Sequence, residues 1–355
     1  MILFSPTRLR QAAAWSSAIR RSLVSVSSLD AEKAPVPTYA PHQARAGYVW
    51  RPALLYGGAY LFFALGVKLL SSATQAQAAP AISGFAFGLA TVAALYVRRG
   101  LLRRRRQNGP PVRLTAANLS SSFACCVIVV TTALAYTFDG VSILLALLLM
   151  RIGVLILAPI IDFANKREVR PASLAGVLIC IGAALLTLFR SSWPTLPTAL
   201  QIVLTLYLLA YFVRLGLMTR FAKTEERAPR GDWFIVETGM VAAASLVVAL
   251  ASLVWSVDTP DAMRVSMVGA FAGATYGLAF VQGTLIYLDW RENTLAVGVN
   301  RSASLLAGMG ASLVGAVMFG FPLPASPEWI AAALVLCALG FLGVRTGALS
   351  SLHKT

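Results

Sequence analysis

The chain has few charged residues and few of the residues that build metal centres. Only 12% of its 355 residues are Asp, Glu, Lys or Arg, about half the share in a soluble domain. Its two histidines, His42 and His353, lie outside the apolar runs, which excludes histidine-bound haem or zinc within a membrane. The four cysteines have no metal-site spacing and are expected to pack as small apolar residues. With no HExxH, GxSxG or Walker motif, the sequence predicts neither an enzyme nor a cofactor.

Apolar residues dominate instead, at 58% of the chain, with a mean hydropathy of +0.74. A soluble protein of this size could not bury so much apolar surface in one core. The composition therefore excludes a soluble enzyme, a disordered chain and a secreted disulfide scaffold. It predicts a polytopic membrane protein.

Ten apolar runs follow one another after residue 50, each long enough to be a candidate membrane span. Lipid offers no hydrogen-bond partner to the backbone, so every span is expected to be helical. The predicted class is an all-α membrane protein with ten transmembrane helices. The ten runs are 53–72, 81–99, 114–136, 140–162, 172–190, 195–217, 233–256, 263–288, 293–320 and 328–346.

Lys and Arg outnumber Asp and Glu by 30 to 14, a net charge of +16. The basic residues gather in alternate connections, at 98–106, 165–170 and 219–231. This is the pattern of the positive-inside rule, and it predicts cytoplasmic termini and an even number of helices. Because the basic residues are explained in this way, no nucleic-acid partner is expected. The predicted location is a bacterial inner membrane.

Residues 1–50 form a separate zone that is rich in Arg, Ser and Ala and has no acidic residue before Asp30. That composition is typical of an organelle-targeting peptide. A disordered cytoplasmic tail and a mis-assigned start codon are the alternatives. The remainder is divided into a first five-helix repeat over 51–190, a second over 191–346 and a cytoplasmic tail over 347–355.

Two stretches, 148–186 and 299–343, have a similar layout. Each has an arginine within a long helix of small and apolar residues, then a break containing proline, then a second apolar helix. Because five is odd, two five-helix halves would sit inverted in the membrane. Inverted repeats are a recurring plan of secondary transporters.

With this layout and the short FDG turn at 138–140, the sequence resembles the EamA-like ten-helix transporters of the drug/metabolite transporter superfamily. The resemblance covers about residues 50–346. It implies transport by alternating access, with the fourth and ninth spans lining a central cavity. The segment AVGVNRSASLL, residues 296–306, also looks like the ninth helix of the organophosphate and nucleotide-sugar branch. A basic pair binds phosphate there; Asn300 stands at the first of the two positions, and Arg301 matches the second.

Two arginines lie within predicted spans, Arg151 in the fourth and Arg301 in the ninth. A charge at this depth costs several kcal/mol unless it meets a cavity or a partner. Together the two guanidiniums could clamp a phosphate or carboxylate, because each offers a planar two-pronged donor. Alternatively, each only bonds backbone carbonyls or an acid and fixes the packing.

Uncharged polar groups within the spans are further candidates for substrate binding. Such groups orient ligands in mostly apolar pockets, although each could equally form an interhelical hydrogen bond. The four candidates are Tyr60, Tyr276, Gln282 and Asn300.

Three charged residues near span ends have competing interpretations. Glu237 could carry a coupling proton or neutralise an intramembrane arginine. Lys68 could serve in gating, although a side chain that snorkels to the interface is the simpler reading. Arg214 is expected to snorkel as well.

Glycines spaced by four residues form one face of the eighth span, at Gly269, Gly273 and Gly277, and Gly308 and Ser312 continue similarly in the ninth. Such faces let helices approach closely. Static packing is favoured over a sliding surface. Pro159 is expected to kink the fourth span.

The predicted function is secondary-active transport of a small, anionic organic metabolite through the bilayer. A homodimer is left open. The alternatives are a non-transport scaffold or accessory subunit, which would use the glycine faces and basic loops, and a lipid flippase of the same fold.

Overall fold

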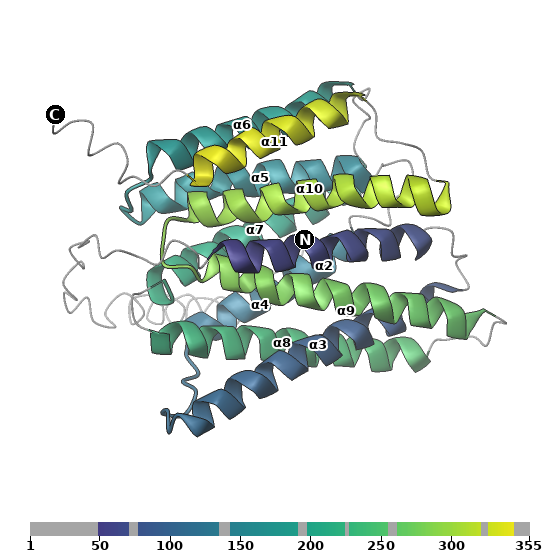
Figure 1. Cartoon of the computed structure of the whole chain (residues 1–355). Coiled ribbons are helices and arrows are strands. Elements are labelled where there is room, and N and C mark those ends of the chain that lie inside the picture. Colours follow the sequence, from purple (N-terminus) through teal and green to yellow (C-terminus); the bar gives the residue numbers. More distant parts are fainter. Residues whose placement is uncertain are drawn as a thin grey trace, which may run out of the picture. The chain divides into compact units, whose positions relative to one another are not determined.

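The computed structural model describes residues 49–70, 77–134, 143–190, 197–223, 227–254, 261–320 and 326–343, and this part of the chain is helical throughout apart from short connections. It contains ten helices, labelled as in Figure 1. Their bounds are α2 Trp50–Leu70, α3 Ala78–Arg106, α4 Ala116–Leu134, α5 Ile143–Ala164, α6 Pro171–Arg190, α7 Thr198–Phe221, α8 Arg227–Val254, α9 Ala262–Tyr287, α10 Asn293–Phe319 and α11 Ser326–Gly343.

Each of the ten predicted apolar runs coincides with one of these helices. Six of them, α2, α3, α7, α8, α9 and α10, are long and apolar enough to cross a membrane, which fits an integral membrane protein. The predicted C-terminal tail, the FDG turn and nearly all of the predicted N-terminal segment lie outside the described residues.

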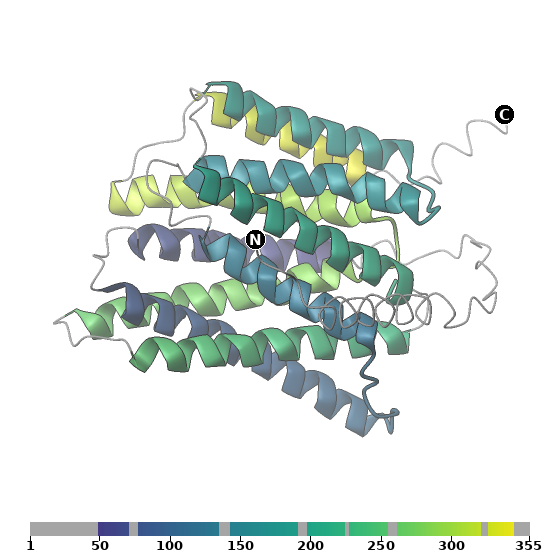
Figure 2. The same cartoon turned by 180° about the vertical axis from the view of Figure 1, so that it is seen from behind.

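The helices run alongside one another in nearly a common direction, with α6 and α11 at one side and α3 and α8 at the other (Figures 1 and 2). Most contacts join helices that are distant in sequence. The contacting pairs include α3 with α8 and α9, α2 with α9 and α10, α4 with α7 and α8, α5 with α6, α7 and α10, and α11 with α6 and α10.

Glycines bring α3 and α9 into backbone contact. A Cβ atom on Gly273 would lie 1.9 Å from the carbonyl oxygen of Phe85, and one on Gly88 would lie 2.1 Å from that of Ala270. The predicted close approach along α9 is therefore present. It does not continue through Gly308, where an added Cβ would meet no atom within 4 Å.

A proline lies within α5, and a glycine ends α10. Helix α5 continues through Pro159, which lies five residues before its end. Helix α10 ends at Phe319, where Gly320 adopts the left-handed conformation with φ of 69°. Only glycine reaches that conformation without steric cost, which is why it is common after helix ends.

Candidate functional site

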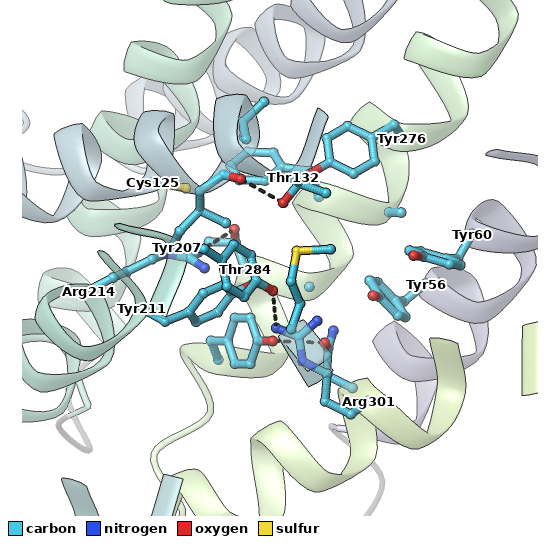
Figure 3. A pocket seen from close by; sticks show the side chains of 18 of the residues that line it. Tyr56, Tyr60, Cys125, Thr132, Tyr207, Tyr211, Arg214, Tyr276, Thr284 and Arg301 are labelled. Carbon is cyan, nitrogen blue, oxygen red and sulfur yellow. Dashed lines mark hydrogen bonds between the residues drawn. The ribbon is translucent and has the colours of Figure 1, made fainter. Parts of the chain in front are cut away.

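A cavity of about 70 Å³ lies between α2, α4, α5, α7, α9 and α10, and we call it the central cavity. Its walls carry an unusual concentration of tyrosine and arginine (Figure 3). The lining residues are Tyr56, Tyr60, Cys125, Ile128, Val129, Thr132, Met150, Arg151, Tyr207, Tyr211, Arg214, Tyr276, Ala279, Phe280, Gly283, Thr284, Tyr287, Asn300 and Arg301.

Helical spacing places these side chains on inward faces. On α7, Tyr207, Tyr211 and Arg214 recur at intervals of four and three residues, so they share one side of the helix. On α2, Tyr56 and Tyr60 recur at an interval of four. Figure 3 shows the α2 and α7 side chains on opposite sides of the cavity, with Arg301 of α10 between them.

The Arg301 guanidinium is held against tyrosines. Its Nη2 donates to the Tyr207 hydroxyl at 3.2 Å, and its central carbon lies 5.0 Å from the centre of the Tyr211 ring. Its Nε is buried without a hydrogen-bond partner among the described residues. Arg301 as a whole is 7% exposed, so its charge is almost entirely removed from water.

Arg151 approaches the same cavity from α5. Its Nη2 donates to the Ser304 carbonyl oxygen of α10 at 3.3 Å, and its guanidinium lies 5.5 Å from the centre of the Tyr60 ring. The side chain is 3% exposed. The backbone contact is the packing role considered above, but it uses one of five N–H donors.

Neither Arg151 nor Arg301 forms an ion pair with a carboxylate among the described residues. Tyrosine rings and a carbonyl compensate a buried positive charge only in part, since charges removed from water require a counter-charge. Among the described residues, the lining of the central cavity contains arginines but no carboxylate.

The structure corrects the interpretation of Arg214 as a snorkelling residue. It is 2% exposed, pairs with the fully buried Glu237 of α8, and donates to the Thr284 hydroxyl at 3.0 Å. Its guanidinium also lies 5.3 Å from the centre of the Tyr287 ring. These partners come from α8 and α9; an arginine partner for Glu237 was one of the two roles considered, but Arg214 was not identified as that arginine. Of the two roles considered for Glu237, the structure shows the ion pair.

The other predicted site residues divide into two groups. Asn300 and Tyr276 line the central cavity with Tyr60. The Tyr287 hydroxyl donates to the Asn300 Oδ1 at 2.8 Å, and the Asn300 Nδ2 has no partner in the part of the chain that the structure describes. Gln282 and Lys68 do not line the cavity. Gln282 is a donor to the Tyr96 hydroxyl at 3.3 Å, and Lys68 is exposed near the end of α2.

Sequence reasoning missed much of the aromatic wall: Tyr56, Tyr207, Tyr211 and Tyr287. Their spacing was the available signal, because tyrosines four apart on an otherwise apolar helix mark one polar face. The cysteine prediction holds for Cys125, Cys126 and Cys180, which pack in apolar clusters, although Cys125 also lines the central cavity. Cys337 is exposed.

A second polar region joins the end of α5 to the starts of α6 and α10. At its centre, the Asp162 carboxylate is fully buried and accepts four hydrogen bonds, from the backbone N–H and the side chain of both Asn293 and Thr294, at 2.7–2.9 Å. These backbone groups are in the first turn of α10, whose N–H groups have no partner within the helix. A carboxylate there also suits the helix dipole. Asp162 thus caps α10 from another helix.

Glu292, the residue before α10, is held in the same region. Its Oε1 accepts from Arg170 Nε at 2.6 Å and from the Ser173 hydroxyl at 2.7 Å. The Asn293 side chain extends the network by donating to the Thr219 hydroxyl of α7 at 2.8 Å. We call Asp162, Arg170, Ser173, Thr219, Glu292, Asn293 and Thr294 the end cluster.

Lys223 lies beside the end cluster, two residues after α7. Its ammonium donates to the Arg291 carbonyl oxygen at 3.2 Å. Burial lowers the pKa of this amine to about 8, and the nearby charge of Arg167 adds to the effect, against the opposing carboxylates of Asp162 and Asp289. Lys223 is therefore a buried amine that loses its proton around pH 8, well below the pH at which a free lysine does so.

No cluster of three or more His, Cys, Asp or Glu residues in the described part of the chain could hold a metal ion. No protein-family model matches the sequence, and no curated protein matches it. A solved structure known only as "Crystal structure of protein" is similar, with a TM-score of 0.58 and 16% sequence identity over 82% of this chain and 98% of the other. At this identity the likeness shows the shared fold alone.

Proposed function

We propose that this chain is a secondary-active transporter that moves a small, anionic organic metabolite by alternating access. The proposal includes ten transmembrane helices in two inverted five-helix repeats, α2–α6 and α7–α11, as in the EamA-like drug/metabolite transporters that the sequence resembles. It requires no cofactor and no covalent chemistry.

The helix contacts support the repeat. Under this repeat α2 corresponds to α7, α3 to α8, α4 to α9, α5 to α10 and α6 to α11. A contact between two helices should then recur between their two counterparts. This holds for α4–α7 and α9–α2, for α3–α9 and α8–α4, for α2–α10 and α7–α5, and for α5–α6 and α10–α11, which are all in contact. The pairs α3–α8, α5–α10 and α6–α11 map onto themselves and are also in contact. Such exchange is expected where a two-fold axis relates two halves.

One observation carries the functional proposal: α5 and α10 each present a buried arginine, without a carboxylate partner, to the same cavity. Arg151 and Arg301 are each the ninth residue of their helix, so they also correspond under the repeat. A phosphate or carboxylate between them would supply the missing counter-charge and could accept from the unpartnered Arg301 Nε and Asn300 Nδ2.

The cavity, at about 70 Å³, is too small in this structure for an organic metabolite. Sites for small organic ligands usually span roughly 300–1,000 Å³. Substrate entry therefore requires helices to separate, as alternating access demands. In this proposal Glu237 couples transport to a proton through its ion pair with Arg214. Protonation of the Glu237 carboxylate would break the pair and free the Arg214 guanidinium to bind the substrate, in addition to those of Arg151 and Arg301.

The proposed setting is a bacterial inner membrane with both termini cytoplasmic, or an organelle membrane if residues 1–50 are a targeting peptide. The cytoplasmic side would then carry the arginines at the end of α3 and the end cluster. This orientation follows from the positive-inside rule. The proposed partners are the substrate and the bilayer, without nucleic acid.

The test is ligand-dependent thermal stability of the purified chain with phosphorylated sugars, nucleotide sugars, carboxylates, amino acids and neutral drugs. It compares wild type, Arg151→Ala, Arg301→Ala and the control Arg264→Ala, whose side chain is exposed at the start of α9. A ligand at a hundredfold its Kd should stabilise the protein by about 2.7 kcal/mol. We expect one anionic class to stabilise wild type and the control but neither cavity variant, and to exchange across proteoliposomes.

Stabilisation that survives both cavity substitutions would contradict the clamp and make the arginines structural. Absence of any response, with both variants only less stable, would favour the scaffold. A response to lipid alone would favour the flippase. Uptake into proteoliposomes that is unchanged by Arg151→Ala and Arg301→Ala would also contradict the assigned site.

A further inference from the structure

A second hollow lies away from the central cavity, between α3 and α8, with a volume of about 470 Å³. We call it the α3–α8 groove. Its walls are apolar except for one residue, Arg98. The lining residues are Ala94, Val97, Arg98, Leu101 and Leu102 of α3 with Gly239 and Ala242 of α8.

The groove follows from residue spacing and helix direction. Positions 94, 97, 98 and 101 lie on one side of α3, and positions 239 and 242 are one turn apart on α8. Small residues leave the space between them: a Cβ atom on Gly239 would have Val97 Cγ2, at 3.9 Å, as its nearest neighbour. Both views show α3 diverging from α8 toward its Arg106 end (Figures 1 and 2).

Arg98 sits at the depth of lipid headgroups if α3 spans the membrane. The uncharged part of α3 runs from residue 78 to residue 97. At 1.5 Å per residue these twenty residues extend about 30 Å, the thickness of the hydrocarbon core. Arg98 is the first charge beyond this segment. Leu101 and Leu102 follow it and remain 44% exposed, so apolar surface is presented beside the charge.

The end of α3 also carries an excess of positive charge. Among the described residues, only Arg104 of its six arginines forms an ion pair, with Asp232 of α8. The remaining five are exposed: Arg98, Arg99, Arg103, Arg105 and Arg106. Only Arg98 of these five lines the groove.

We propose that the α3–α8 groove binds an anionic phospholipid of the surrounding bilayer. The acyl chain would lie against Ala94, Val97, Gly239 and Ala242, and the phosphate would accept hydrogen bonds from the Arg98 guanidinium. The other exposed arginines favour anionic over zwitterionic lipid through their longer-range field. This site is separate from the central cavity and does not depend on transport.

The test measures lipid retention by native mass spectrometry and the Tm of the full chain, after titration with phosphatidylglycerol or phosphatidylcholine. We compare wild type with Arg98→Gln, which removes the headgroup contact, and Gly239→Leu, which fills the groove. The control is Arg105→Gln, which removes the same charge from the same helix end outside the groove.

We expect phosphatidylglycerol to be retained preferentially and to raise the Tm. Arg98→Gln should weaken retention about fivefold, the equivalent of about 1 kcal/mol for one arginine at the membrane surface. Gly239→Leu should weaken retention without a change of charge, while Arg105→Gln stays close to wild type.

Three results would overturn the proposal. Equal retention of the two lipids would show that charge is not recognised. Wild-type retention in both Arg98→Gln and Gly239→Leu would show that the lipid binds elsewhere. An equal loss of lipid retention in Arg105→Gln and Arg98→Gln would show that the lipid is attracted by the overall positive charge of this helix end and not bound in the groove.

Discussion

The end cluster and two arginines of the central cavity differ in how their buried charge is compensated. In the end cluster, Asp162 accepts four hydrogen bonds and Glu292 pairs with Arg170. In the central cavity, Arg151 and Arg301 are buried to a similar degree but have no carboxylate among the described residues. Each region also contains single polar atoms that have no hydrogen-bond partner within the described ranges, so the difference lies in the charges.

This difference supports the proposal that the central cavity binds a ligand, whereas the end cluster stabilises the fold. A buried charge without a counter-charge lowers stability, and the end cluster shows that this fold supplies partners where it needs them. The uncompensated arginines are therefore the feature that the proposed anion would complete. The four predictions that follow test this contrast between compensated and uncompensated charge, beginning with the largest effect.

Arg214→Met should cause the largest loss of stability, because it leaves Glu237 fully buried without its partner. Breaking a buried ion pair from one side costs about 3–5 kcal/mol. The measurement is the Tm and the fraction folded after purification in detergent. Arg214→Met combined with Glu237→Leu should recover most of the loss, because neither charge then remains. No recovery in the double variant would assign the loss to packing rather than charge.

Asp162→Asn should be the next most damaging change. The substitution keeps the shape but removes the charge that holds the first turn of α10, and it places an amide donor opposite N–H groups. We expect a loss of about 2–3 kcal/mol in thermal unfolding. Glu168→Gln, at an exposed position in the same connection, should stay within about 0.5 kcal/mol of wild type. If the two substitutions had equal effects, the Asp162 carboxylate would not stabilise the first turn of α10 through its charge.

Arg301→Met should have the opposite sign in the absence of ligand. Because the substitution removes an uncompensated buried charge, we expect the free energy of unfolding without ligand to rise by about 1–2 kcal/mol, and the Tm to rise with it. Stabilisation by anions should disappear. Arg301→Lys keeps the charge but not the planar fork, so anion binding should be weakened without the gain in stability. A strong loss of ligand-free stability in Arg301→Met would show that this arginine is already compensated.

The smallest expected effect is a change in the free energy of unfolding with pH that is caused by Lys223. Its pKa is about 8 in the folded chain against 10.5 for the free side chain. Between these values the unfolded chain binds more protons, so the free energy of unfolding rises with pH. The gain between pH 8 and pH 9 should be about 1 kcal/mol, measured as the difference between wild type and Lys223→Met. Parallel pH profiles would show that Lys223 titrates normally.

The sequence predicted the helices well because length and apolarity set them locally. Each of the ten runs contains a helix, and boundaries differ by several residues where charged ends continue the helix, as in α3, which extends to Arg106. Arg151 and Arg301 could be singled out because a charge within an apolar run is costly wherever it lies.

Partners across helices could be predicted only in part: an arginine partner was considered for Glu237, but the sequence did not show which arginine it would be. Arg214 appeared to be near a span end, and only the packing of α8 and α9 brings Glu237 and Thr284 to it. Gln282 and Tyr276 looked equivalent along α9, yet Tyr276 faces the central cavity and Gln282 does not. A single sequence gives helical faces but not the rotation of each face toward its neighbours.

The glycine contacts between α3 and α9 have a mechanical consequence. At Gly84, Gly88, Gly269 and Gly273 an added Cβ would lie within 2.6 Å of a backbone oxygen of the facing helix, so no flexible side chain separates the two backbones there. The two helices therefore cannot slide past each other through changes of side-chain rotamer, and α3 and α9 should move together as one rigid unit. Tyr276 and Thr284 lie on α9, so under the proposed transport any helix motion around them would occur where this pair borders α2, α8 and α10.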